Sequence, residues 1–129
     1  VGKTRLSSSG LTKENTAYVS TTGFIVAKAG DVIRVPEEYF REGSCYVCSY
    51  NSSFEFISAV NYSGAYGGGT VTTNGNIKEI TLLNNSNIAY VRISMSWLSD
   101  AKHYSESNDA TQGPCEFMLV TVNEEITDW

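Results

Sequence analysis

Residues 18–35, with the sequence YVSTTGFIVAKAGDVIRV, decide the fold class of this chain. Both ends of the stretch are rich in β-branched and aromatic residues, which suit a pleated, half-buried strand. Between them, residues 27–31 predict a tight turn in which Gly30 can adopt a positive φ. Gly23 interrupts the first arm and indicates a bulge or a bend, as where a strand crosses from one sheet to another. We therefore expect a β-hairpin with a structural role.

Similar strand patterns continue on both sides of this stretch. The turn cluster at residues 51–53 predicts a hairpin, and Asn74-Gly75 is the strongest short hairpin signal in the chain. Residues 88–95 alternate between apolar and polar side chains, which indicates a sheet with one face on the core. The expected strands outside the opening stretch are 4–6, 45–50, 54–62, 71–73, 77–83, 88–95 and 115–123.

Eight or nine short antiparallel strands separated by frequent turn signals predict an all-β fold, a sandwich or a barrel. A jelly-roll-like β-sandwich suits the strand count better than an immunoglobulin-like one, whose Cys…Trp…Cys spacing is absent. We expect one domain over residues 1–129, a module of a longer chain, with at most a turn or two of helix near residues 37–41. The three glycines at 67–69 indicate a flexible loop.

The composition argues against several function classes. The formal net charge of −5 and the scattered basic residues disfavour a nucleic-acid surface. The sequence contains no run of about 18 apolar residues, so no membrane-spanning helix is predicted. Catalysis by a Ser-His-Asp or Cys-His device would have to use His103, the single histidine, and no G-x-S-x-G turn accompanies it. We therefore expect no catalytic residues and no enzyme activity.

The three cysteines do not form a complete metal-binding pattern. Cys45 and Cys48 make a C-x-x-C inside a strand-like run, and Cys115 lies far away in the sequence. A zinc site of these three with His103 is formally possible, but buried small hydrophobes are the preferred interpretation. Residues 107–109 could hold calcium, although their spacing matches no EF-hand loop. We expect neither a metal nor a cofactor.

Several segments together resemble modules found at the ends of phage and prophage tail proteins. They are RLSSSG (5–10), YVSTTGFI (18–25), GDVIRV (30–35), YNS (50–52), FIS (56–58), NIAYVRIS (87–94) and VTVNE (120–124). Such modules are similar to carbohydrate-binding β-sandwiches and serve host attachment or tail assembly. The resemblance implies synthesis in a bacterial cytoplasm, a place in the virion tail, and a homo-oligomer within the tail assembly. It transfers no binding site, because the matching residues look like core and turn positions.

Two irregular stretches supply the candidate ligand-binding residues. Both lack strand periodicity, so they are expected at the surface, and their aromatic and amide side chains suit sugar recognition. The predicted contacts to cell-surface carbohydrate are Trp97, His103, Tyr104, Asn108 and Asp109 in residues 96–114, with Tyr62 and Tyr66 in residues 62–69. Trp97 directly follows a core strand and could equally cap the core. The alternative function is a structural tail module that oligomerises or docks onto a neighbouring domain without binding glycans.

Overall fold

The computed structural model describes residues 4–10, 12–14, 18–20, 24–41, 45–96 and 121–123. These residues form eleven strands, more than the eight or nine expected, and one 3-10 turn at Glu37–Tyr39, which confirms the helical turn predicted there. The strands are β1 (Thr4–Leu6), β2 (Thr12–Glu14), β3 (Tyr18–Ser20), β4 (Ile25–Val26), β5 (Val32–Pro36), β6 (Tyr46–Tyr50), β7 (Phe56–Asn61), β8 (Gly69–Asn74), β9 (Ile77–Leu82), β10 (Tyr90–Ser96) and β11 (Thr121–Val122).

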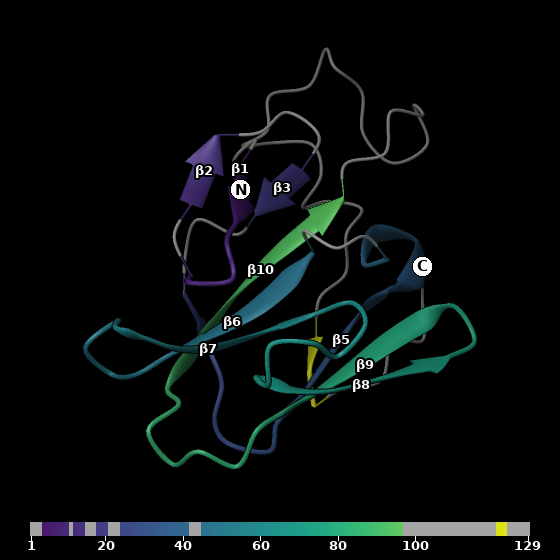
Figure 1. Cartoon of the computed structure of the whole chain (residues 1–129). Helices are drawn as coiled ribbons and strands as arrows, with labels where there is room; N and C mark the ends of the chain where they lie inside the picture. Colours follow the sequence, from purple (N-terminus) through teal and green to yellow (C-terminus); the bar gives the residue numbers. More distant parts are fainter. Residues whose placement is uncertain are drawn as a thin grey trace.

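Two antiparallel sheets make up most of the described structure (Figure 1). The first has the strand order β3-β10-β6-β7, with β4 also pairing to β10. The second has the order β11-β5-β9-β8, and β1 and β2 form a separate two-stranded ribbon. This architecture confirms the predicted all-β class, and its two antiparallel sheets are consistent with the predicted sandwich.

The main hydrophobic core lies between the two sheets. Ile33 of β5 and Ile80 of β9 contribute fully buried side chains from the second sheet. Val47 of β6 and Ile93 of β10 belong to the same cluster and come from the first sheet. The predicted alternation is confirmed within β10, where Val91, Ile93 and Met95 all belong to this core. The strand begins at Tyr90, two residues later than predicted, and Ile88 is buried in the core instead of Ala89.

The predicted hairpin at residues 18–35 is wrong. Strand β4 pairs with β10, whereas β5 pairs with β9 and β11 in the other sheet. Residues 27–31 therefore carry the chain from one sheet to the other, with Gly30 at φ +76°. Gly23, where a bend was expected, lies outside the described residues. The local sequence marks a turn correctly but contains no information on which strands each arm will pair with.

The hairpin signal at Asn74-Gly75 is confirmed, with the turn one residue later than predicted. Asn74 pairs with Ile77, so the two-residue loop consists of Gly75 and Asn76. Gly75 has φ +61°, as the first loop position of a type II′ turn requires.

The expectation of a flexible loop at residues 67–69 is also wrong. Gly67 forms a bridge with Ala59 of β7, and the Gly68 N–H donates to the Ala59 carbonyl at 2.8 Å. The Gly68 carbonyl accepts from the Leu83 N–H at 3.2 Å. A side chain at Gly68 would collide with the Ala59 backbone, so glycine is required here for close backbone contact between the sheets.

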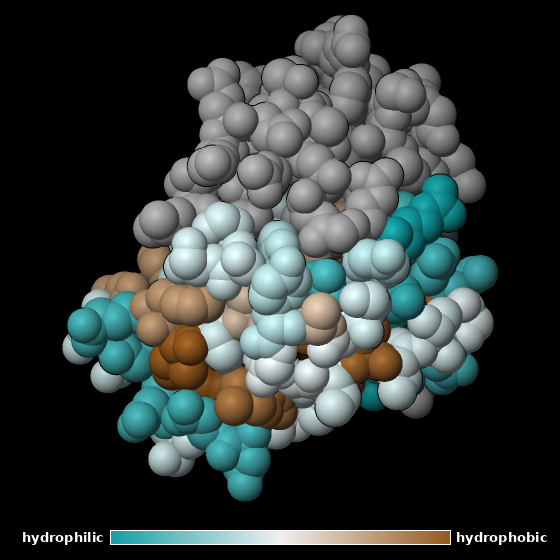
Figure 2. Space-filling model, viewed as in Figure 1, coloured by the Kyte–Doolittle hydropathy of each residue, from teal (hydrophilic) through white to brown (hydrophobic). Residues whose placement is uncertain are grey.

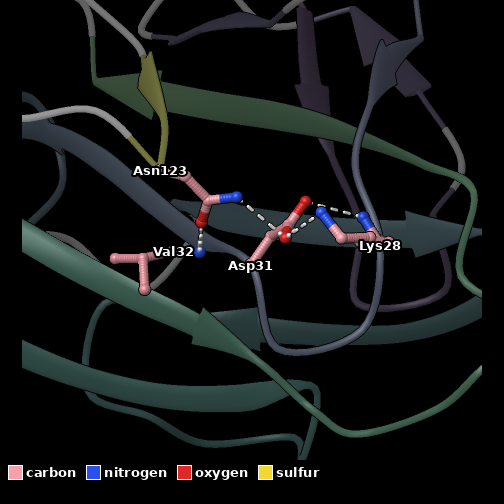
Figure 3. Close-up of polar contacts among 4 residues, drawn as sticks. All are labelled: Lys28, Asp31, Val32 and Asn123. Atoms are coloured by element: carbon pink, nitrogen blue, oxygen red, sulfur yellow. Dashed lines mark hydrogen bonds and ion pairs between the residues drawn. The ribbon is translucent and has the colours of Figure 1, made fainter.

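A polar clamp joins the end of β11 to the start of β5 (Figure 3). Asn123 accepts a hydrogen bond from the Val32 N–H at 2.8 Å and donates to the Asp31 carboxylate at 2.9 Å. The Asp31 carboxylate also accepts from the Lys28 N–H at 2.9 Å and pairs with the Lys28 ammonium at 3.1 Å. Burial raises the pKa of Asp31, but the bonds from Asn123 and Lys28 outweigh it and hold the pKa below the usual 3.8.

This clamp predicts a defined acid sensitivity. A lowered carboxyl pKa stabilises the fold above the unfolded-state value of 3.8, and this stabilisation disappears as the pH falls through the folded-state pKa. Replacing Asp31 by Asn should cost about 1–3 kcal/mol at pH 7, because the amide cannot accept from both donors. The difference in the free energy of unfolding between this variant and wild type, measured with urea, should shrink as the pH falls from about 4 to about 2. Asn123→Gly, which keeps the positive φ, should show the same trend; a pH-independent loss in both would contradict the assignment.

Candidate functional site

The first sheet is buried on both faces around β6. Beyond the main core, its outer face carries a second cluster formed by Tyr46, Cys48, Tyr50 and Ala59. Residues 7–10 cross over this cluster: the Tyr50 hydroxyl donates to the Gly10 carbonyl at 2.8 Å, and the Cys48 thiol donates to the Ser7 carbonyl at 3.6 Å. The cluster is therefore covered in part by residues 7–10, which two hydrogen bonds hold in place.

An aromatic surface surrounds Tyr50 on this outer face; we define it as Phe24, Phe54, Phe56 and Tyr90. The Phe24 ring meets Tyr50 edge-on with centroids 4.9 Å apart, and Phe56 meets Tyr50 at 6.1 Å. Phe54 stacks on Tyr90 at 4.9 Å and also contacts Phe24 at 4.9 Å. Figure 2 shows hydrophobic side chains gathered over the region where Figure 1 places β6 and β7. Phe54 is 54% exposed despite these contacts.

The loop that carries Phe54 is held by its own hydrogen bonds. The Asn51 side-chain oxygen accepts from the Ser53 and Glu55 N–H groups, both at 2.9 Å. The Asn51 N–H donates to the Glu55 carbonyl, and the Phe54 N–H donates to the Asn51 carbonyl, again at 2.9 Å. Phe54 itself has φ +64°, a left-handed conformation that is unfavourable for a bulky side chain.

The same loop geometry recurs at the other end of β7. The Asn61 side-chain oxygen accepts from the Ser63 and Ala65 N–H groups, both at 3.0 Å. The Asn61 N–H donates to the Ala65 carbonyl at 3.2 Å, and the Gly64 N–H donates to the Asn61 carbonyl at 3.0 Å. Its left-handed fourth position is Gly64, with φ +84°.

The comparison of the two loops isolates what is unusual about Phe54. Gly64 occupies the left-handed position without strain, whereas a residue with a Cβ pays about 1–2 kcal/mol there. Phe54 occupies the equivalent position and stays about half exposed, with its ring packed on Phe24 and Tyr90. Backbone preference does not account for phenylalanine here, its packing is only partial, and strained exposed residues of this kind concentrate at functional sites.

Two titratable groups beside the aromatic surface, Cys48 and Tyr50, are poorly suited to nucleophilic attack at neutral pH. Burial raises the pKa of the Cys48 thiol and of the Tyr50 phenol, each to about 12, although the nearby Arg92 guanidinium lowers both. The guanidinium lies 5.2 Å from the centre of the Phe24 ring, where it makes a cation–π contact. These groups support the shape of the site and supply no activated nucleophile.

Cys45 and Cys48 point to opposite faces of the first sheet. Cys45 lies in the main core and Cys48 in the outer cluster, as expected for residues three apart on a strand. The two thiols are buried small hydrophobes, as predicted, and cannot share one ion in this arrangement. Within the described ranges, no group of three or more His, Cys, Asp or Glu side chains is placed to hold a metal. Cys115 and residues 107–109 lie outside those ranges.

The structure separates the two predicted ligand-binding tyrosines. Tyr66 is exposed on the outer face and its ring meets Tyr46 at 5.5 Å. Tyr62 is half-buried and packs against the main core instead. The other predicted contacts, Trp97, His103, Tyr104, Asn108 and Asp109, lie outside the described residues.

The sequence interpretation missed the aromatic surface. Phe24 and Tyr90 looked like ordinary strand residues, and Phe54 looked like the start of a strand. The available signal was the spacing Asn-x-Ser at 51–53 and again at 61–63, which precedes both left-handed positions.

No helix in the described part of the chain has the length and apolar character needed to cross a membrane. Comparison with protein-family models, curated proteins and solved structures finds no match to this chain.

Proposed function

We propose that this domain is a non-catalytic module that binds carbohydrate through the aromatic surface on the outer face of its first sheet. The observation that carries the proposal is Phe54, an exposed ring held in a strained conformation by a hydrogen-bonded loop. Flat aromatic faces pack on the C–H faces of sugar rings, and a pre-ordered ring loses little entropy when it binds. Sugar binding then accounts for the unfavourable left-handed conformation of Phe54.

The surroundings of Phe54 support a sugar over a purely apolar ligand. Ser52 and Ser53 are exposed in the same loop and offer hydroxyl groups beside the ring. Hydrolysis of a glycoside would need two facing carboxylates. Among the described residues around this surface we identify one candidate, Glu55, whose carboxylate accepts from the Asn51 amide at 3.1 Å. Binding without turnover is therefore the function that this arrangement supports best.

The biological setting follows from the sequence resemblance to phage and prophage tail modules. In that setting the carbohydrate is a polysaccharide of the host cell surface, and the module sits in the virion tail as part of an oligomeric assembly. A jelly-roll topology within the sandwich belongs to the same proposal.

A structural tail module is the second candidate. Val26 is 75% exposed at the end of β4, and Phe56 is 39% exposed on the aromatic surface. Apolar groups in such positions also suit docking onto a neighbouring tail domain.

An array of bacterial cell-surface polysaccharides separates the two candidates. The fluorescently labelled, folded protein should bind at least one polysaccharide, and the recovered glycan should keep its chain length by mass spectrometry. Shortened glycan would contradict a non-catalytic role. Absence of binding to every polysaccharide, with a β-type circular dichroism spectrum intact, would leave the structural module ahead.

A further inference from the structure

Tyr66 is a second exposed aromatic residue on the same outer face. It is 60% exposed and has φ +76°, so it shares with Phe54 both exposure and an unfavourable left-handed backbone. Among the described residues, the remaining non-glycine position with positive φ is Asn123, whose side chain serves the clamp with Asp31. The two strained aromatic residues of this part of the chain are thus both exposed on one sheet face.

The two rings stand at opposite ends of β6. Tyr66 packs on Tyr46, the first residue of β6. Phe54 packs on Phe24, which in turn packs on Tyr50, the last residue of the strand. Four residues of extended chain span about 13 Å, and Tyr46 and Tyr50 point to the same face. This separation is too long for one sugar ring to touch both aromatic groups.

Exposed serine hydroxyls lie on the described surface between the two rings, and the Arg92 guanidinium lies on the same face against Phe24. Residues 7–10 cross β6 there, anchored through Cys48 and Tyr50. Ser8 and Ser9 are exposed on this crossing, and the Ser9 hydroxyl is 2.8 Å from the Ser7 hydroxyl. Serine hydroxyls between two aromatic rings offer hydrogen bonds to a ligand that is itself rich in hydroxyl groups.

We infer that Tyr66 forms a second subsite, so that the ligand is an extended polysaccharide segment lying along β6 from Phe54 to Tyr66 across the serines. This inference rests on the proposed carbohydrate binding. It adds that the ligand is longer than one sugar ring and that it lies along β6. Two linked contacts on one rigid surface strengthen binding only for a ligand long enough to reach both.

The test compares ligand lengths. The polysaccharide that binds best on the array is depolymerised with mild acid, separated by size, and titrated calorimetrically against wild type, Tyr66→Gly and Phe54→Gly. Glycine suits both left-handed positions, so both variants should fold, which thermal melting checks. Thr72→Ala, at an exposed position of β8 in the other sheet, is the matched control.

Wild-type affinity should rise with ligand length and then level off. Tyr66→Gly should match wild type for the shortest fragments and bind long ones about tenfold more weakly. Phe54→Gly should weaken binding at every length, and Thr72→Ala should change nothing. Equal affinity of Tyr66→Gly and wild type at all lengths, or an equal loss at all lengths, would overturn the second subsite while the proposed function stands. If Phe54→Gly also binds like wild type, the proposed site fails as well.

Discussion

Gly68→Ala should destabilise the folded protein by about 3 kcal/mol or more, since forcing an extra carbon into a filled space and losing hydrogen bonds both act against folding. An alanine Cβ would lie 2.5 Å from the Ala59 carbonyl oxygen, and the contact is with backbone, which cannot rotate away. The Gly68 hydrogen bonds to Ala59 and Leu83 would be displaced together with this contact. Because these bonds join β7 to the second sheet, their loss should lower the free energy of unfolding of the whole domain.

Gly30→Ala is the matched control for this effect. Gly30 has φ +76° and open space around the position of a Cβ, so alanine there meets backbone strain without a collision. Its expected loss is about 1 kcal/mol. Urea unfolding of the two variants should therefore differ by about 2 kcal/mol. Equal stabilities would mean that the close contact at Gly68 does not hold the sheets together.

Phe54→Gly should separate stability from binding. Glycine relieves about 1 kcal/mol of left-handed strain, which offsets the loss of ring packing against Phe24 and Tyr90. The free energy of unfolding should thus change by less than about 1 kcal/mol. Affinity for the bound polysaccharide should fall roughly 30-fold, equivalent to about 2 kcal/mol, because an aromatic anchor carries much of the binding energy of a site.

Phe54→Tyr provides the control for this prediction. It keeps an aromatic ring in the same conformation, so its affinity should stay within about threefold of wild type. Urea unfolding and calorimetric titration of both variants measure the two effects. A Phe54→Gly protein that is much less stable than wild type and binds equally well would show that the ring serves folding and not recognition.

The parts of the fold that the sequence predicts are those set by local pattern. The alternation along β10 identifies Val91, Ile93 and Met95 as core residues without any knowledge of their neighbours. The pairing of the strands on either side of Gly30 could not be obtained in this way. Their composition suits a hairpin as well as a crossing between sheets, and the choice depends on β9 and β10 far along the chain.

The candidate site was harder to predict for a related reason. Tyr66 is predicted because its stretch lacks strand periodicity and is therefore expected at the surface, and the structure exposes it. Phe54 is not predicted, since an aromatic residue beside a strand normally belongs to the strand, and its positive φ becomes visible only with the hydrogen bonds of Asn51 in place. The three consecutive glycines at 67–69 predict a flexible loop, whereas the structure shows that Gly68 allows close contact between two backbone segments.

The paired loops at the ends of β7 have a consequence for how such a module can evolve. In both loops the Asn side chain and the backbone make the bonds that fix the shape, and the fourth residue contributes its N–H alone to them. The side chain at that position is thus free to vary without redesign of the scaffold, as Gly64 and Phe54 already illustrate. In the proposed carbohydrate-binding role, single substitutions at residue 54 would change ligand specificity while the hydrogen bonds that shape the loop stay the same.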